Sequence, residues 1–327
     1  MQVNYIGSKV KLLSFIDEHL SSLLKEDVAL KIFCDLFAGS GSVGSYFAHK
    51  GWSILSNDVE FYSYVLNYAL LKPPELSAIT PIIDALNALP LRKGLMYEHY
   101  CLESGSGRNY FSAENAQKID AVRQGIEAYK RDEPLYIYLL ASLLHSADKV
   151  ANTASIYSAY LKHLKPLACE KLHLHAFPTR ASHANHQVFC EDANGLISTL
   201  TGDILYLDPP YNRRQYGANY HILNTIARYD AFTPKGKTGV RAYESSAYCK
   251  SRTALLALED VIQKARFSWI ILSYNDEGII DLSSLSNMLE RYGRCASFQM
   301  SHQRFKGYRN QENKKALSEY LYILEKM

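Results

Sequence analysis

The feature that most constrains the fold is a glycine-rich turn between two short apolar segments near the N-terminus. The apolar run ALKIFCDLF at 29–37 leads directly into AGSGSVG at 38–44. Residues 42–50 then resemble the opening of a helix, and residues 51–55 a second strand that closes on Asp58. Strand, turn, helix, strand and acid in this order are typical of a βαβ unit.

The rest of the chain predicts an α/β sheet built from both ends, with a mainly helical insertion between them. Helical spacing marks residues 11–24 near the N-terminus, and later 113–131 and 134–145. Further short apolar segments, at 186–191, 204–207, 269–273 and 320–324, are typical of buried strands. We therefore expect a discontinuous sheet domain at 1–70 and 186–327, and an insertion at 71–185.

Composition excludes several classes of protein. With 47% hydrophobic and 21% charged residues the chain is expected to be globular, and a net charge of +3 does not by itself indicate nucleic-acid binding. No apolar run reaches the roughly 18 residues of a membrane span. The six cysteines form no CxxC pair and the histidines at 173–186 lack flanking acids, so we expect reduced thiols, no metal site and a cytoplasmic protein.

The glycine turn predicts a nucleotide-like ligand. Residues 39–44 match GxGxxG after a strand and before a helix, whose free N–H groups favour ligand binding. The turn lacks the Gly-Lys-Ser/Thr ending of a P-loop, which argues against that motif. Asp58 is placed to accept hydrogen bonds from ribose hydroxyls. These features leave NAD and S-adenosylmethionine open. Asp35, just before the turn, favours the second because a carboxylate would repel a pyrophosphate and attract an amino cation.

A second motif, DPPY at 208–211, follows the apolar strand ILYL. Two prolines make a rigid corner with free carbonyl groups, Asp208 adds an acceptor, and Tyr211 adds an aromatic face. Two acceptors beside an aromatic ring suit an exocyclic NH₂ group on a planar base.

With these two motifs the sequence resembles the D12-class (alpha-group, Dam-like) DNA N6-adenine methyltransferases. NYIGSKVKLL at 4–13 is similar to the family's N-terminal cofactor motif, DLFAGSGSVG at 35–44 to its main cofactor loop, and SNDVE at 56–60 to its ribose-binding acid. FCED at 189–192 resembles the strand end that contacts the cofactor adenine, DPPY the catalytic motif, and NKKALSEYLYIL at 313–324 the closing strand. The motif order, with DPPY late and an insertion between, is that of the alpha group.

The resemblance implies a Rossmann-like S-adenosylmethionine-dependent methyltransferase sheet and a set of site residues. Methyl transfer is expected to be a direct displacement onto N6 of an adenine flipped out of duplex DNA, without a metal. The expected catalytic residues are Asp208, Pro209, Pro210 and Tyr211. The expected cofactor-binding residues are Tyr5, Gly7, Lys11, Asp35, Phe37, Ala38, Gly39, Ser40, Gly41, Asp58, Asp192 and Asp208.

Two local patches of positive charge predict where DNA binds. Residues 208–252 hold eight Lys/Arg against three Asp/Glu, and residues 291–315 hold seven against one, with aromatic residues interleaved. The expected DNA-binding residues are Arg213, Arg214, Tyr216, Lys235, Lys237, Arg241, Arg304, Lys306 and Arg309. The insertion at 71–185 is the expected target-recognition domain.

Several alternatives stay open. N4-cytosine methylation uses the same amine chemistry, although Ser more often replaces the Asp of the corner in those enzymes. RNA adenine methylation, glutamine methylation and a catalytically inactive DNA-binding protein are further readings, and the intact Asp208 and Tyr211 argue against the last. The resemblance also implies the modification half of a bacterial restriction–modification system, with double-stranded DNA as substrate, a cognate endonuclease that need not bind, and a monomer.

Overall fold

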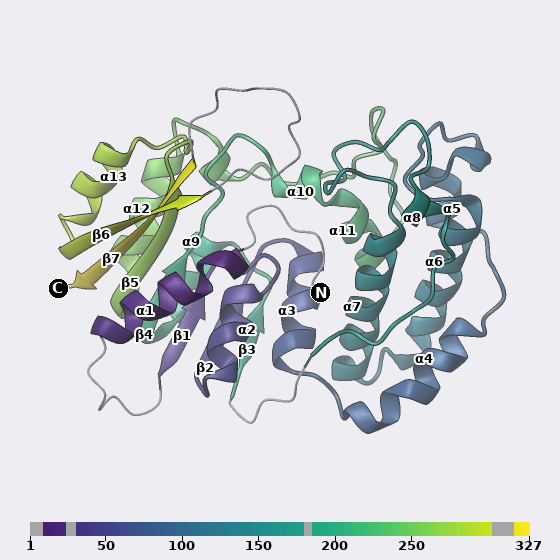
Figure 1. Ribbon diagram of the computed structural model, residues 1–327, viewed down its shortest axis with the longest axis horizontal. Coiled ribbons are helices and arrows are strands. Elements are labelled where there is room, and N and C mark those ends of the chain that lie inside the picture. The colour runs from purple at the N-terminus through teal and green to yellow at the C-terminus, as the bar shows by residue number, and fades with distance from the viewer. Residues whose placement is uncertain (1–8, 24–30, 180–184, 303–316) are drawn as a thin grey trace.

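The computed structural model describes residues 9–23, 31–179, 185–302 and 317–327, and it places a sheet with flanking helices beside a mainly helical part (Figure 1). Short α10 (Tyr216–Asn219) lies between the two parts. The chain therefore crosses from the sheet to the helical part directly after the 208–211 corner.

The sheet has seven strands within the described residues, in the order β3-β2-β1-β4-β5-β7-β6. The strands are β1 (Ile32–Asp35), β2 (Ser53–Asn57), β3 (Gln187–Phe189), β4 (Thr201–Leu207), β5 (Arg266–Asn275), β6 (Gly293–His302) and β7 (Leu317–Lys326). β1 to β5 run parallel, whereas β7 is antiparallel to β5 and β6 is antiparallel to β7. The expected α/β sheet and its six expected strands are confirmed. β6, which has few long apolar side chains, was not expected.

Strand order also fixes where a ligand can bind. From β1 the chain winds outward through β2 to β3, and it then returns to β4 on the other side of β1. The carboxyl ends of β1 and β4 therefore form the point where the winding reverses, and ligands of open α/β sheets bind in the crevice outside such a point.

Helices cover both faces of the sheet, and alternating side chains of each strand enter two separate cores. Phe33 of β1 joins one cluster and Cys34 the other, as do Ile271 and Ile270 of β5. The helices associated with the sheet are α1 (Leu13–Leu23), α2 (Ser42–His49), α3 (Phe61–Leu71), α9 (Ala193–Leu196), α12 (Ala254–Lys264) and α13 (Leu282–Leu289).

The helical part shares one of these cores. Leu86, Ile119 and Leu139 belong to the same buried cluster as Phe33 of the sheet. Its helices are α4 (Ile79–Asn87), α5 (Leu95–Tyr100), α6 (Ala113–Ile126), α7 (Glu133–Val150) and α8 (Pro166–Cys169). Single 3₁₀ turns are η1 (Lys9–Leu12), η2 (Leu76–Ala78), η3 (Leu102–Ser104), η4 (Glu127–Tyr129), η5 (Ile197–Thr199) and η6 (Ala247–Cys249). The insertion at 71–185 is thus packed onto the sheet through a continuous core.

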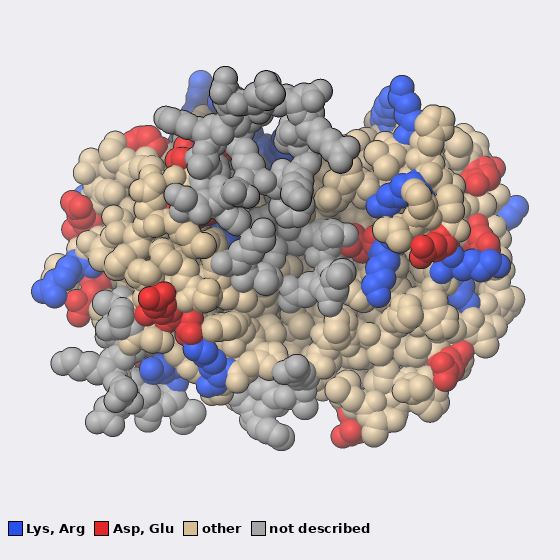
Figure 2. All heavy atoms as spheres, in the orientation of Figure 1, with Lys and Arg blue, Asp and Glu red and all other residues tan. Residues whose placement is uncertain are grey.

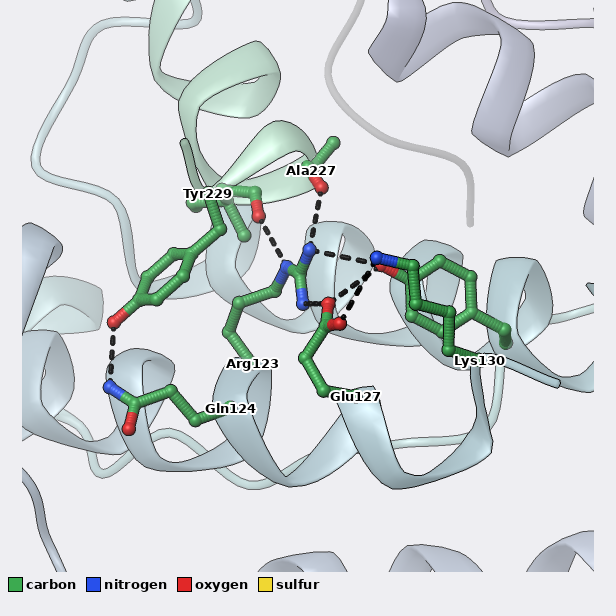
Figure 3. Close-up of polar contacts among 8 residues, drawn as sticks. Arg123, Gln124, Glu127, Lys130, Ala227 and Tyr229 are labelled. Carbon is green, nitrogen blue, oxygen red and sulfur yellow. Dashed lines mark hydrogen bonds and ion pairs between the residues drawn. The ribbon is translucent and has the colours of Figure 1, made fainter. Parts of the chain in front are cut away.

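A later segment also docks on the insertion. Helix α11 (His221–Arg228) ends against α6, where the guanidinium of Arg123, only 3% exposed, donates to the carbonyl groups of Ile226 (3.0 Å) and Ala227 (3.1 Å) (Figure 3). Glu127 binds the opposite side of Arg123 at 2.6 Å. A cation on the last carbonyl groups of a helix offsets the helix dipole. The chain after the 208–211 corner is therefore fixed to the helical part.

The described ranges contain neither a membrane-spanning helix nor a metal-binding cluster. No helix there combines the length and the apolar character that crossing a bilayer requires. No group of three or more His, Cys, Asp or Glu side chains is arranged there to hold a metal ion.

Candidate active site

The ends of β1 and β4 bring both sequence motifs to one pocket. The two strands are adjacent and parallel, with Asp35 in register with Tyr206, so that Asp35 and Asp208 reach the same edge of the sheet. A pocket of ≈ 300 Å³ lies there. The expected site residues that line it are Asp35, Phe37, Ala38, Gly39, Ser40, Asp58, Asp192, Asp208, Pro210 and Tyr216.

The glycine turn takes a backbone shape that side chains disfavour. Gly39 and Gly41 have φ values of 51° and 76°, in the left-handed region. Gly39 lines the pocket, whereas a Cβ atom on Gly41 would meet Leu70 Cδ1 at 2.6 Å and Asn67 Oδ1 at 2.8 Å. Gly41 is therefore required by the packing of the turn against α3, and the pocket lining does not include it.

Asp58 braces the turn. The backbone N–H of Gly39 donates to its Oδ2 at 2.8 Å, and the N–H of Glu60 donates to its Oδ1 at 2.9 Å. Burial raises the pKa of this carboxyl, and the two backbone donors oppose the rise. The carboxylate that was expected to bind ribose thus also holds the glycine turn in place, and the ribose contact stays a prediction.

Asp35 is a buried carboxyl with one unused oxygen. The N–H of Gly44 donates to Oδ2 at 3.1 Å, while Oδ1 has no hydrogen-bond partner among the described residues. Burial raises the pKa of Asp35 to about 8, with a further contribution from the negative charge of Asp208. An orphaned carboxylate oxygen in a pocket suits a cationic ligand group.

The charge of the whole pocket agrees with this fit. Its described lining contains seven carboxylates and one lysine, Lys9. The carboxylates belong to Asp35, Asp58, Glu60, Glu191, Asp192, Asp208 and Glu244. Such a lining repels a pyrophosphate and favours a ligand that carries an amino cation, a sulfonium centre and ribose hydroxyls. The residues present therefore fit S-adenosylmethionine better than NAD.

The raised pKa of Asp35 gives a prediction for cofactor binding. Because the amino cation prefers ionised Asp35, the affinity for S-adenosylmethionine should rise about tenfold per pH unit from pH 6 toward pH 8 and fall above that as the amino group loses its charge. Binding at pH 7 should release about one proton, which calorimetry in buffers of different ionisation enthalpy would detect. The amino group of the cofactor titrates near pH 8, so Asp35→Asn is the control. That variant should show a flat profile below pH 7, and an unchanged slope would contradict the assignment.

The 208–211 corner lies beside Lys9. Asp208 Oδ1 lies 3.3 Å from Lys9 Nζ, and the Lys9 ammonium is 5.6 Å from the centre of the Tyr211 ring. The Tyr211 ring packs edge-on against the Tyr274 ring, with the ring centres 6.1 Å apart. The backbone carbonyl of Tyr211 accepts from the N–H of Ile279. Burial raises the pKa of Asp208 to about 6, whereas Lys9 lowers it. Residues 208–211 therefore form a corner supported from β5 and from η1.

Sequence reasoning missed three parts of the site. Lys9 reaches Asp208, and Glu319 of β7 binds Lys9 from the other side. Segment 244–248 forms one wall of the pocket, where the Tyr248 ring lies edge-on to Phe37 at 5.0 Å. One signal was available: Glu319 is a carboxylate directly before the apolar run YLYIL of its strand.

Other expected site residues take diverse positions. Tyr5, Gly7, Arg304, Lys306 and Arg309 lie outside the described residues, as does the side chain of Lys11. Asp192 caps α9 by accepting from the N–H of Gly195 at 3.0 Å.

Among the expected DNA-binding residues, exposure separates two groups. Arg213, Arg214, Lys235 and Lys237 are exposed. Arg241 is only 11% exposed and binds both oxygens of Asp230 at 2.9 Å. The hairpin at 235–240 is fixed to the helical part, since Tyr100 Oη donates to the Gly239 carbonyl at 2.7 Å.

Comparison with known proteins identifies the family. The model of the D12 class N6 adenine-specific DNA methyltransferases matches residues 5–288. The Type II methyltransferase M.NlaIII of Neisseria lactamica is 48% identical, over 99% of each chain. M.CviAII of Paramecium bursaria Chlorella virus 1 is 36% identical, over 93% of each chain. M.FokI of Planomicrobium okeanokoites is 34% identical, over 99% of this chain and 53% of its own length.

The family match covers both the cofactor loop and the 208–211 corner, and the full-length relatives align from end to end. This chain therefore belongs to the D12 class of N6 adenine-specific DNA methyltransferases, enzymes whose methyl donor is S-adenosylmethionine.

Proposed function

We propose that this protein methylates N6 of an adenine flipped out of duplex DNA, with residues 208–211 as the catalytic corner. The observation that carries the proposal is that Asp208 and the glycine turn at Gly39 line the same pocket. A methyl donor held by the turn and a base amine held by the corner would thus meet without any large movement of the chain.

The roles of the protein's own groups follow from their positions. Asp35 and Asp58 would hold the amino and ribose ends of S-adenosylmethionine, which supplies an electrophilic methyl group when bound. Asp208 and the Pro209 carbonyl accept the two N6 hydrogens, and Tyr211 stacks on the base. The ionised carboxylate favours positive charge as it develops on N6, and Asp208 is the nearest acceptor for the proton that leaves.

The test identifies the methylated base. Purified protein, duplex DNA and labelled S-adenosylmethionine are incubated, and the DNA is digested to nucleosides. We expect N6-methyladenine, whose sequence context then gives the recognition site. N4-methylcytosine would overturn the assignment of the base, and label in RNA alone would overturn the substrate. Cofactor binding without any transfer would support the catalytically inactive DNA-binding protein instead.

A restriction–modification role is part of the same proposal. It is supported by the relatives, which are named Type II methyltransferases. The role implies a bacterial, cytoplasmic setting, a cognate endonuclease for the same site that need not bind this chain, and a monomer that methylates one strand at a time. Plasmid from cells that express the protein should resist an endonuclease that cuts the mapped site, and sensitivity would contradict the role.

We further propose that DNA lies along the exposed arginines beside the corner and that the insertion at 71–185 contributes base recognition. The proposal depends on local charge, because Figure 2 shows Lys, Arg, Asp and Glu interspersed over the visible coloured surface rather than one basic face. Arg213 and Arg214 are exposed and follow Tyr211 after a single intervening residue, Asn212. Cationic side chains next to the catalytic corner can neutralise the phosphates that flank a flipped base.

The two arginines give a salt-dependence prediction. The double variant Arg213→Gln/Arg214→Gln should bind DNA more weakly, and the slope of log K against log salt concentration should fall by about 1.8, the value for two lost phosphate contacts. Fluorescence anisotropy with a labelled duplex at several salt concentrations measures this slope. Lys264→Gln, which removes a 44% exposed lysine at the end of α12, next to the start of β5 and so at the other edge of the sheet from the corner, is the control and should leave the slope unchanged. An equal slope in the double variant would remove these residues from the DNA surface.

A further inference from the structure

A buried lysine stands between two carboxylates at the catalytic corner. Lys9 Nζ lies 3.3 Å from Asp208 Oδ1 and 3.3 Å from Glu319 Oε2, and the Lys9 side chain is only 4% exposed. The three residues come from η1, from the end of β4 and from β7, which are separated by about the whole length of the chain. Neither Lys9 nor Glu319 was expected from the sequence to belong to the site.

The arrangement is more than a simple ion pair. A buried ammonium is costly unless carboxylates surround it, and burial alone would lower the pKa of Lys9. Asp208 and Glu319 together outweigh that effect and raise the pKa, so that Lys9 stays charged. Glu319 is in register with Asn275 on β5, which gives it a rigid position at the edge of the sheet. Lys9 is thereby held from a strand that does not contribute to the 208–211 corner.

The position of Lys9 also decides which oxygen of Asp208 is available. Oδ1 is buried, faces the ammonium and accepts no hydrogen bond from the described residues. Lys9 therefore occupies the side of Oδ1, and Oδ2 is left for the amine of the target base. An ammonium at this distance also favours the ionised form of the carboxylate, which is the form that accepts two N–H donors well.

We propose that Lys9 stands on the Oδ1 side of Asp208 and leaves Oδ2 directed to the target amine, and that Glu319 is a positioning residue that holds Lys9 in this place. The inference rests on the proposed role of Asp208 as the acceptor for N6. It adds two residues to the machinery, one at each end of the chain, and assigns Glu319 no contact with the substrate.

The signs of the two contributions can be separated, because several groups face Asp208. From the elements around it these are Lys9, Glu319, Asp35, Tyr206, Tyr211 and Tyr216. Burial and the charge of Glu319 raise the pKa of Asp208, and Lys9 lowers it. Removing the charge of Lys9 should therefore raise that pKa, removing the charge of Glu319 should lower it, and a general loss of packing could only lower it, so the rise in the Lys9 variant is the shift that a structural defect does not produce.

The experiment measures single-turnover methylation against pH at saturating S-adenosylmethionine. In Lys9→Met the acid limb should move upward by about 1–3 pH units, the usual effect of one nearby opposite charge. In Glu319→Gln the acid limb should move downward, because a negative charge is lost while Lys9 stays beside Asp208, and the plateau rate should fall several-fold, because an uncharged amide holds Lys9 less firmly. Glu325→Gln makes the same change on the same strand at an exposed position and should leave both quantities unchanged.

A second readout does not depend on DNA. Aspartate labelled with ¹³C at the carboxyl carbon allows Asp208 to be titrated by NMR, with its signal assigned by its loss in Asp208→Ala. The same opposite shifts of the pKa are expected in the two variants. Titrations that coincide with wild type in both variants would overturn the inference.

If wild-type protein methylates no DNA, the proposed function fails, while the NMR titration still decides the role of Lys9 and Glu319. If Lys9→Met does not fold, Glu319→Gln alone carries the test.

Discussion

Replacing Asp208 with alanine is expected to lower the rate of methyl transfer by about 10³-fold or more, in line with the loss of one preorganised group at a reacting centre. The alanine removes the carboxylate acceptor for the N6 hydrogens and the negative charge that stabilises developing positive charge on nitrogen. Lys9 keeps one partner, since Glu319 remains 3.3 Å away, so the buried cation is not left alone. The loss should therefore appear in the chemical step rather than in folding.

Single-turnover assays at saturating cofactor measure this loss directly. Calorimetric titration with S-adenosylmethionine should still show binding, because the proposed cofactor ligands Asp35 and Asp58, at the ends of β1 and β2, are unchanged. Asp84→Ala is the matched control, since Asp84 lies exposed on α4 in the helical part and should leave the rate unchanged. A rate in Asp208→Ala within tenfold of wild type would show that another group accepts from N6, and the catalytic assignment would then be wrong.

The parts of the fold that were predicted correctly are those that depend on neighbours in sequence. The run before Gly39 is apolar enough to be a buried strand, and the glycines that follow it indicate a tight turn. The βαβ unit could therefore be predicted. β6 has no such signal, since Arg294, Gln299 and His302 interrupt its apolar pattern and it pairs only with β7. It owes its structure to that one partner, which sequence periodicity does not identify.

The site residues likewise divide into those that could be predicted from the sequence and those that could not. Asp35, Asp58 and Asp208 each follow a strand directly, and the carboxyl ends of parallel strands meet at one edge, so their proximity could be expected. Lys9 and Glu319 reach Asp208 only because η1 packs near the sheet and β7 runs antiparallel to β5. An antiparallel strand brings its first residues to that edge instead of its last ones, and no local pattern announces this reversal.

The contact of the chain after the 208–211 corner with the insertion could not be predicted from the sequence either. Residues 216–228 were expected to belong to the sheet domain; α11 does contact α3 of that domain, where Asn224 accepts from the N–H of Tyr62, and it also docks on the insertion through Arg123 of α6. That contact joins segments about 100 residues apart and uses a guanidinium on backbone carbonyl groups, a pairing that any arginine could make. The proposal of a separate recognition domain at 71–185 therefore needs to include α11 as part of the same packed unit.

Gly41→Ala is expected to have the largest effect on stability, lowering the free energy of unfolding by about 2–5 kcal/mol. A left-handed backbone costs an alanine roughly 1–2 kcal/mol, and forcing a methyl group into a filled space costs about 1–3 kcal/mol more. The new Cβ atom would meet Leu70 Cδ1 at 2.6 Å and Asn67 Oδ1 at 2.8 Å. Asn67 also donates to the carbonyl of Gly39, so its displacement should disturb the turn and weaken cofactor binding.

Gly51→Ala separates the two causes. Gly51 has a φ of 85° but nothing within 4 Å of a Cβ atom, so that its alanine variant suffers only the backbone cost, about 1 kcal/mol after the reduced freedom of the unfolded chain is counted. Urea unfolding of both variants, with m-values compared, gives the two free energies. The difference between them measures the contact of the turn with α3. Equal losses would show that Leu70 and Asn67 move aside, and the close approach of α3 would then not be what requires glycine at position 41.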